Sequence, residues 1–533
     1  MRSFHLLLQA PLRSTLCWLL LMPGLGAIAQ TTTELRSTPT DSAIDEALRL
    51  YLPFPGALPP QKTSPQSLRA RLQSLEARWE ALRSQYDRRP QVSLLKALEV
   101  GLSTNPVLAQ SFAEIGAAEW TTSAVRREWF PALYFTQPNN APWAAAVATQ
   151  AGNQSTSTTP SSYQNLQQFY TSPRLTMRWT FLDPTRVPRL GADLSSLQSK
   201  RLLFDVSVRN LILDIQESYY NLQEARELRG LYTHLFELTH SQLRRAQQLR
   251  AKGVNNQGDV SQLRAQLLAQ LIQIIQLFQQ EITAANHLAS NMSLPPGLLN
   301  SPADQLAPVP AWSTPLQSTI DGALQMREEI RINLAQSQNY SWKSLALMKR
   351  YLPQMALMGQ SQMATNEQLE LSSGSQRGFS TSRSANLRNS LGLTFNWLMY
   401  DGGIDTANAL AMRQQAAASQ AAAASSRLSV TMEVQDNYAS FLTNQIIIDT
   451  ARDQVYAARE ALADATRAYN GTTINATTYI QIMQNYVSAV RSYKASVKNF
   501  NIAVDALYRN SAQIPPMAIK AMEQSRLSLQ APP

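Results

Sequence analysis

Apolar and polar residues alternate in two stretches of this chain, LTMRWTFLDP at residues 175–184 and LTFNWLMYDG at residues 393–402. Successive side chains of a β-strand point to opposite faces of the sheet, so this period of two predicts one strand in each stretch. The residues expected on the apolar faces are Leu175, Met177, Trp179, Phe181, Leu393, Phe395, Trp397 and Met399. Those expected on the polar faces are Thr176, Arg178, Thr394 and Asn396.

Longer stretches of the chain have the period of a helix. The four long predicted helices cover residues 188–252, 259–292, 404–470 and 477–510. A helix of about 60 residues extends on the order of 90 Å, and it needs neighbouring helices along that length. The pattern therefore predicts antiparallel coiled-coil pairs. Gly253 and Gly471 separate the members of each pair, and both are expected to end their helix in the left-handed conformation. Asp183 and Asp401 follow the predicted strands, and we expect each to cap the helix after it.

Both stretches belong to one longer unit that the sequence contains twice. In each copy a helical segment ends in Phe130-Pro131 or Leu352-Pro353 and leads into a short strand, a polar loop, the alternating strand and the helix pair. The polar loops are expected at residues 137–172 and 364–386. The predicted organisation is a signal peptide (1–29), an N-terminal extension with a Pro-rich linker and a short helix (30–91), a first repeat (92–295), a Pro-rich linker (296–315), a second repeat (316–512) and a C-terminal tail (513–533).

The start of the chain is typical of a secretory signal peptide. Arg2 and Arg13 precede or flank the apolar run 16–21, and Ala-Ile-Ala stands before Gln30, so we expect cleavage after Ala29. The single cysteine, Cys17, lies inside this segment. The processed chain would then have neither a disulfide nor a thiolate metal site. Leu16 is larger than the residue that a lipoprotein signal places before its cysteine, so lipidation is not expected.

Charge and motifs give little sign of chemistry. The formal net charge is +10, but Lys and Arg are dispersed among Gln, Ser and Ala, which indicates a solvated surface and not a nucleic-acid site. The sequence has no paired-carboxylate motif, phosphate-binding loop, nucleophile elbow or metal-ligand spacing. We therefore expect no enzymatic activity and no cofactor.

The predicted strands allow two interpretations. They fit the wall of an outer-membrane barrel, in which strands of about ten residues turn their apolar side chains to lipid. They also fit the soluble head of a secreted or periplasmic coiled-coil protein with a structural or adhesive role. Four strands cannot close a barrel, and an open edge in lipid leaves backbone groups unpaired. The membrane interpretation therefore requires several copies of the chain.

The doubled order of these features resembles the outer membrane efflux protein family, the TolC-like channel-tunnels, over about residues 92–510. The resemblance rests on the helix containing ALEVGLSTNPVLAQ, which ends in Phe130-Pro131, on the strand end LTFNWLMYDGG, and on the Gly-containing helix turns. It implies a mainly α fold with a small β part. Three chains would each supply four strands to a 12-strand transmembrane β-barrel and long helices to a periplasmic α-barrel.

The resemblance also implies a function and partners. The chain would be a passive homotrimeric exit duct of a tripartite efflux pump or a type I secretion system. It would lie in the outer membrane lipid of a Gram-negative-type bacterium, with its helical tunnel in the periplasm. Its partners would be a periplasmic membrane-fusion adaptor and an inner-membrane transporter of the RND, ABC or MFS type.

In that family the tips between the long helices form the periplasmic gate and meet the adaptor. The matching residues are Lys252, Gly253, Val254, Asp259, Asn470, Gly471, Thr473 and Thr477. Asp259 matches a family aspartate that holds the closed gate. Thr473 stands where better-known members carry an arginine, and Thr477 and Ile480 stand where they carry aspartates. The usual acidic ring is therefore expected to be absent.

Overall fold

The computed structural model describes residues 89–136, 146–154, 162–253, 256–373 and 378–529, and a few positions between 74 and 84. The chain divides into two units, residues 1–82 and 83–533. The expected signal peptide and nearly all of the N-terminal extension lie outside the described residues. Everything below concerns the second unit.

The four long helices are present, two in each repeat, as the sequence predicts. The helices of the first repeat are α3 (Leu94–Thr104), α4 (Pro106–Arg127), α5 (Arg186–Ala251) and α6 (Gln257–Asn291). Those of the second are α7 (Leu316–Met326), α8 (Glu328–Met348), the short 3-10 helix η1 (Lys349–Tyr351), α9 (Ile404–Asn470) and α10 (Ala476–Asn510), and α11 (Pro516–Leu529) follows.

Each segment before the first strand of a repeat is two helices and not one. The breaks are at Asn105 and Arg327, which have extended backbones with ψ of 123° and 122°. Pro106 explains the first break, because a proline disfavours the helical conformation of the residue before it. Arg327 has no following proline, but its guanidinium binds Glu329, Glu433 and Asn510 at the same joint.

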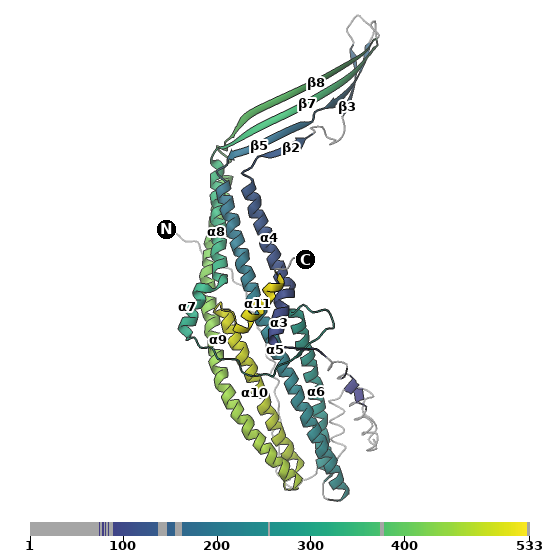
Figure 1. Ribbon diagram of the computed structural model, residues 1–533, viewed down its shortest axis with the longest axis vertical. Helices are drawn as coiled ribbons and strands as arrows, with labels where there is room; N and C mark the ends of the chain where they lie inside the picture. Colours follow the sequence, from purple (N-terminus) through teal and green to yellow (C-terminus); the bar gives the residue numbers. More distant parts are fainter. Residues whose placement is uncertain are drawn as a thin grey trace, which may run out of the picture. The chain divides into compact units, whose positions relative to one another are not determined.

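Six strands form an antiparallel sheet that is four columns wide (Figure 1). They are β2 (Ala132–Thr136), β3 (Ala146–Gln154), β4 (Ser162–Thr171), β5 (Arg174–Leu182), β7 (Gln354–Ser373) and β8 (Gly378–Asn396). β2 and β3 make the first column, because they pair with β5 and β4 respectively. β4 and β5 make the second column and both pair with β7, and β8 pairs with the other edge of β7. The outer edges of the first column and of β8 have no partner strand among the described residues.

The expected polar loops are largely strand. Residues 364–373 and 378–386 extend β7 and β8, and residues 146–154 and 162–171 form β3 and β4. The prediction failed because it relied on an apolar face. These segments are rich in Ser, Thr, Asn and Gln on both faces, yet backbone pairing does not require apolar side chains.

Each strand column connects to one helix, and the columns have the same order across the sheet as their helices have across the helical layer. The columns run β2/β3, β5/β4, β7 and β8. The first column follows α4, the second leads into α5, β7 follows α8, and β8 leads into α9. Correspondingly α4 packs on α5, α5 on α8 and α8 on α9. Further from the sheet α6 packs on α5, and α10 packs on α9 and α5. The fold is therefore a wall with two open edges, one at α4 and α6 and the other at α9.

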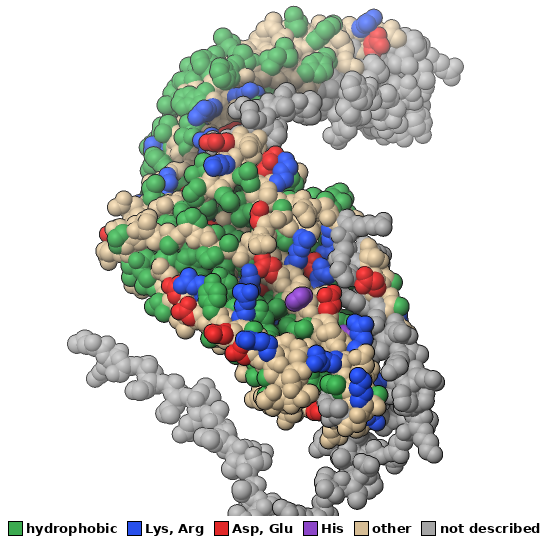
Figure 2. Space-filling view, turned by 60° about the horizontal axis from the view of Figure 1, so that its bottom comes forward, with side chains coloured by type: hydrophobic (Ala, Val, Ile, Leu, Met, Phe, Trp, Pro, Cys, Tyr) green, Lys and Arg blue, Asp and Glu red, His purple; other side chains and the backbone are tan. Residues whose placement is uncertain are grey.

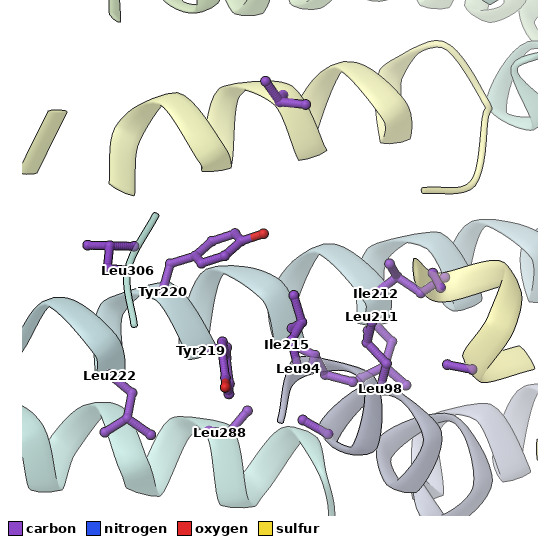
Figure 3. Packing of buried hydrophobic residues seen from close by; sticks show 14 of the residues in the cluster. Leu94, Leu98, Leu211, Ile212, Ile215, Tyr219, Tyr220, Leu222, Leu288 and Leu306 are labelled. Carbon is purple, nitrogen blue, oxygen red and sulfur yellow. The ribbon is translucent and has the colours of Figure 1, made fainter. Parts of the chain in front are cut away.

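The main core lies where short segments cross the long helices. Side chains of α3, α5 and α6 meet there, with Leu98, Ile215 and Leu288 fully buried (Figure 3). The linker between the repeats is part of this core. Its residues Ser301–Pro302 form β6, which pairs with β1 (Gln91–Val92), and Leu306 and Trp312 are buried.

The two aspartates that follow the strands lie two residues before the helix caps, which corrects the expectation that they are caps themselves. The N-caps are Thr185 for α5 and Gly403 for α9. Asp183 Oδ1 accepts hydrogen bonds from the Thr185 backbone N–H (2.9 Å) and hydroxyl (2.7 Å). Asp401 accepts from the N–H groups of Asp405 (2.8 Å) and Gly403 (2.9 Å), and these bonds hold the pKa of Asp401 below its ordinary value. The carboxylates thus stabilise the first turns of α5 and α9 from a position two residues before each N-cap.

Candidate functional site: the strand sheet and the helix tips

The strand register brings the apolar faces of all four columns to one side of the sheet. Three rows cross the sheet on that side: Leu133–Met177–Gly359–Leu391, Trp179–Leu357–Leu393 and Leu182–Met355–Phe395. Met177 and Leu391 flank Gly359, where a Cβ would meet their side chains at ordinary van der Waals distances of 3.7 Å and 3.6 Å. Leu133, Leu391, Leu393 and Phe395 are each at least 60% exposed.

These exposed side chains make an apolar sheet face that nothing in the described part of the chain covers. In the view of Figure 2 hydrophobic side chains form a broad area near the top, where the sheet lies, and charged side chains gather over the lower helices. Contiguous apolar areas of this kind mark contacts with a membrane or another protein.

Three of the residues expected on the apolar face are placed differently. β8 ends at Asn396, so Trp397 and Met399 follow the strand instead of belonging to it. Phe181 lies at a bulge, where Thr180 pairs with Ala356 and Leu182 with Met355. Leu182 therefore takes the place in the row that alternation assigned to Phe181, whose ring lies 6.0 Å from that of Trp179.

Each repeat uses its tryptophan to fix the junction between strand and helix. Trp179 Nε1 donates to the Trp129 carbonyl (3.0 Å), and Trp397 Nε1 donates to the Tyr351 carbonyl (2.9 Å). Both acceptors directly precede the Phe130-Pro131 and Leu352-Pro353 pairs that open the first strand of each repeat. A tryptophan in the returning strand of the first copy, and just after the returning strand of the second, thus holds the start of the outgoing strand. Arg189 adds a bond to Asp183 (3.0 Å) in the first copy, and Tyr351 adds one to Asp401 (2.7 Å) in the second.

The opposite face of the sheet is mostly polar. Its rows are Thr136–Arg174–Gln362–Arg388, Tyr134–Thr176–Gln360–Ser390, Ala132–Arg178–Met358–Gly392 and Thr180–Ala356–Thr394. Thr176, Arg178 and Thr394 lie here, as alternation predicts, and Asn396 lies at the strand end opposite Gln354. Arg174 and Arg388 were not among the predicted polar-face residues. They follow from the same alternation, one step of two residues before Thr176 on β5 and three such steps before Thr394 on β8.

The tip between α5 and α6 follows the expected glycine geometry. Lys252 is the C-cap of α5, and Gly253 has a φ of +78° with its N–H bound to the Arg250 carbonyl (2.9 Å). Val254 lies outside the described residues. Asn256 caps α6 through its side chain, and Asp259 is the acidic residue of the first turn, where a negative charge is favourable.

At the tip between α9 and α10 the expectation for Gly471 was wrong. Gly471 is the C-cap with a φ of −81°, and the left-handed residue is Thr472, with a φ of +58°. The Thr472 N–H binds the Tyr469 carbonyl (3.1 Å), and the Thr473 N–H binds the Ala468 carbonyl (2.9 Å). Both bonds of a Schellman motif are thus present, with the motif one residue later than the glycine suggested.

The two tips contact each other through hydrogen bonds, and no ion pair is part of this contact among the described residues. Arg245 Nη2 donates to the Asn470 carbonyl (2.7 Å), and Thr477 Oγ1 donates to Gln262 Oε1 (2.8 Å). A cleft of about 400 Å³ lies between the tips, and its lining includes Arg245, Asp259 and Thr473. No ion pair joins Asp259 to a described residue. Thr477 stands at a position where better-known family members carry an aspartate. Here it joins the two helix pairs through a neutral hydrogen bond to Gln262.

The structure thus brings Asp259, Asn470, Thr473 and Thr477 together. Arg245 and Gln262 belong to the same site, although no sequence pattern marks them. Each lies inside a long helix whose surface is rich in Arg and Gln, so only the packing of α5 and α6 against α9 and α10 distinguishes them.

None of the helices in the described part of the chain is long and apolar enough to cross a membrane. Within the same residues, no group of three or more His, Cys, Asp or Glu side chains could hold a metal ion.

Comparison with known proteins finds the fold among outer-membrane channels. No family model matches the sequence, and no curated protein matches it. Among solved structures, the CmeC outer membrane channel of Campylobacter jejuni has a TM-score of 0.63 at 15% identity, covering 81% of this chain and 89% of that one. The outer-membrane channel OprN has 0.61 at 20% identity, with 80% and 94% covered. The outer membrane protein VceC of Vibrio cholerae has 0.60 at 14%, with 79% and 96% covered. The resemblance to TolC-like channel-tunnels is therefore confirmed at the level of the fold.

Proposed function

We propose that this protein is a passive exit duct in the outer membrane. The observation that carries the proposal is the wall of four strand columns and four helices, which has the same order and the same two open edges in both layers. One face of the sheet is apolar and exposed, as a surface against lipid must be. The other face is mostly polar, as the lining of a water-filled passage must be. The shared fold with outer-membrane channels supports this assignment.

The open edges require further copies of the chain. Backbone N–H and C=O groups at a strand edge cannot stay unpaired in lipid, and a heterologous contact that repeats around an axis closes into a ring. Four columns per chain are too few for the smallest barrels, which have about eight strands. We therefore infer a ring of several chains. Two chains would already give eight columns, and it is the resemblance to TolC-like channel-tunnels that implies three, with 12 strand columns in the membrane and an α-barrel of helices in the periplasm.

In this assembly the residues have distinct roles. Leu175, Met177, Trp179, Leu393 and Phe395 face lipid, Trp397 and Met399 lie at the membrane boundary, and Thr176, Arg178, Thr394 and Asn396 face the pore. The tips at Lys252–Asp259 and Asn470–Thr477 close the periplasmic end and meet a membrane-fusion adaptor. The adaptor couples the duct to an inner-membrane transporter of the RND, ABC or MFS type, in an efflux pump or a type I secretion system.

The alternative is a secreted or periplasmic coiled-coil protein without transport activity. It would need a cover for the exposed apolar sheet face and for both strand edges. Fractionation of cells separates the two functions, because a duct requires detergent for extraction from the outer membrane and a coiled-coil protein does not. Extracted protein should migrate as a trimer and give single-channel currents in planar bilayers. A water-soluble monomer without conductance would overturn the proposal.

The role of the tips has its own test. Replacing Arg245 by Ala removes the bond to the Asn470 carbonyl, so the tips should separate more easily and the leak current should rise. Arg244→Ala is the matched control, because Arg244 is an exposed neighbour of the same charge for which no bond to a tip is seen. Equal currents in the two variants would exclude Arg245 from the gate.

A further inference from the structure

Three arginines lie on the polar face of the sheet, and we infer that they form a belt that makes the passage selective for anions. They are Arg174 and Arg178 on β5 and Arg388 on β8. The inference rests on the proposed function, because the polar face must line the passage. It adds a class of solute, namely anions such as carboxylates and phosphate esters, for which the proposed duct alone implies no preference.

The register places the three side chains close together on one face. Arg174 and Arg388 belong to the same transverse row and are separated only by Gln362 of β7. Two strand spacings put their backbones about 10 Å apart. Arg178 is four residues along β5 from Arg174, about 14 Å away on the same face. The three positions therefore form one compact group across the sheet.

No carboxylate neutralises this group. The four polar-face rows from Thr136–Arg174–Gln362–Arg388 to Thr180–Ala356–Thr394 contain no Asp or Glu. On the same face of β7, Glu370 comes eight residues beyond Gln362, about 26 Å along the strand. Arg174 Nη2 donates to Gln362 Oε1 (3.2 Å), which is a neutral partner. Among the described residues no ion pair involves Arg174, Arg178 or Arg388. Arg178 and Arg388 are exposed.

A fourth arginine on the sheet shows the contrast. Arg383 lies on β8 but at a position of the opposite face, and its Nε lies 3.3 Å from Glu367 Oε1 of β7. Its charge is thus paired on the apolar side, whereas the three belt arginines leave their charge on the polar side. Arg383 therefore provides a matched control on the same strand.

Unpaired guanidinium groups that line a narrow aqueous passage raise the local concentration of anions and lower that of cations. The spacings of about 10 and 14 Å exceed the Debye length of about 8 Å at physiological ionic strength, so the anion preference should be stronger at low salt, where the Debye length is longer. Three arginines in each of three chains would bring nine charges to the passage. Arginine remains protonated across the accessible pH range, so the selectivity should not depend on pH between about 5 and 9.

The test is the reversal potential of single channels in planar bilayers under a KCl gradient. The wild-type duct should pass chloride in preference to potassium. Replacing all three belt residues (Arg174→Gln, Arg178→Gln, Arg388→Gln) should bring the permeability ratio close to one or invert it. The triple Lys variant should retain the preference, and Arg383→Gln should leave it unchanged.

The outcomes separate the belt from the function on which it rests. Conductance with a cation preference in the wild type, or with the same ratio in the triple Gln variant, overturns the belt and leaves the duct intact. A wild-type protein without any conductance overturns the duct itself. If the triple Gln variant does not insert, Arg388→Gln alone is measured, since Arg388 is exposed at the sheet edge, and its ratio should move in the same direction.

Discussion

A threonine at the second helix tip occupies a conformation that favours glycine. A β-branched residue with positive φ costs about 1–2 kcal/mol, and such strain persists only where the surroundings enforce it. Thr472 is held by the two Schellman bonds to Tyr469 and Ala468. The glycine one residue earlier has an ordinary φ of −81°, and a Cβ there would meet its neighbours at van der Waals distances of 3.5–3.6 Å.

The two tip glycines should therefore respond differently to the same substitution. Gly253→Ala places a residue with a Cβ in the left-handed region and should lower the free energy of local unfolding at this tip by about 1 kcal/mol. Gly471→Ala should be neutral or slightly stabilising, because its backbone suits any residue. Hydrogen exchange of the amides around each tip measures the difference. Equal protection in the two variants would contradict the assigned conformations.

A second residue with an unusual environment is Asp505, which is 5% exposed on the face of α10 toward α5. Burial raises its pKa to about 7, although hydrogen bonds from Tyr220 and Gln216 act in the opposite direction. Arg209 and Arg509 line the small cavity beside it. The folded protein thus binds a proton that the unfolded chain, with a carboxyl pKa near 3.8, has already released.

The sign of the pH dependence follows from this difference. Since the folded state binds more protons between about pH 4 and pH 7, stability falls as the pH rises through that window. Asp505→Asn removes the charge, so it should stabilise the protein at pH 8, by up to about 4 kcal/mol, and have a much smaller effect near pH 4. Thermal unfolding at both pH values checks this, with the exposed Asp436→Asn as control. A stabilisation that is equal at both pH values would argue against the buried charge.

The tips also show what could be read from the sequence and what could not. The glycines located both turns, because a helix end needs a residue that tolerates the left-handed conformation. They did not reveal that Thr472 takes that conformation, since the choice between two adjacent residues depends on how the chain enters α10. Arg245 and Gln262 were missed for a similar reason, because their partners lie more than 200 positions away.

The linker between the repeats is a packed element, although the sequence predicts only that a Pro-rich segment separates the two repeats. Lys494, Asn501 and Tyr508 are seven residues apart on α10 and therefore share one face. Lys494 Nζ approaches the Leu306 carbonyl (3.5 Å), Asn501 binds Ala307 and Val309 (both 2.9 Å), and Tyr508 meets the Trp312 ring (4.8 Å). Fourteen helical residues rise about 21 Å, and six extended residues span about 20 Å. The linker therefore runs alongside α10.

Asn501 is the central contact between α10 and the linker segment 306–312, which we call the strap. It is fully buried, and its amide both donates to the Ala307 carbonyl and accepts from the Val309 N–H. Asn501→Ala should cost about 2–3 kcal/mol, because both backbone groups lose their partner. Limited proteolysis within residues 303–312 and thermal unfolding report the loss. Asn485→Ala, at an exposed site of the same helix, should change neither. Unchanged proteolysis of the Asn501 variant would mean that other contacts hold the strap.

The repeat predicted the elements of the fold better than their packing. The long helices have a strong period of their own, so residues 404–470 were predicted with the same ends as α9. The sequence predicts loop for the far halves of β7 and β8, because a strand that is polar on both faces has no alternation to detect. The sheet edges and the apolar face were predictable. The row that joins Arg174 to Arg388 was not, because it depends on how β5, β7 and β8 pair, and the sequence of one strand does not determine that register.

The outer face of α9 has an apolar stripe that no described element covers. Leu428, Leu442 and Tyr456 are spaced by 14 residues, as are Met432 and Ile446. This is the spacing of a coiled-coil seam, and Ile446 is 70% exposed. At the opposite edge of the wall α4 exposes Phe112 and Trp120. Both edges are thus suited to contact another copy of the chain.

A charge in this stripe should prevent assembly without unfolding the chain. Ile446→Glu would bury an unpaired carboxylate in the contact between copies, at a cost of several kcal/mol. The expected result is a shift from trimer to monomer by native mass measurement in detergent, with unchanged helix content. Thr443→Glu adds the same charge on a neighbouring, exposed face and should leave the trimer intact. A trimer that forms normally from the Ile446 variant would exclude α9 from the interface.

The common order of strands and helices bears on the fidelity of assembly. Because β2/β3, β5/β4, β7 and β8 connect to α4, α5, α8 and α9 in the same sequence, two chains that meet at the sheet also meet at the helices. A neighbour shifted along the strand edge would displace the α9 stripe from its partner at the same time. A shifted neighbour would therefore lose contacts both at the strand edge and at the helix edge. Two separate surfaces thus favour the correct alignment of neighbouring chains before the ring closes.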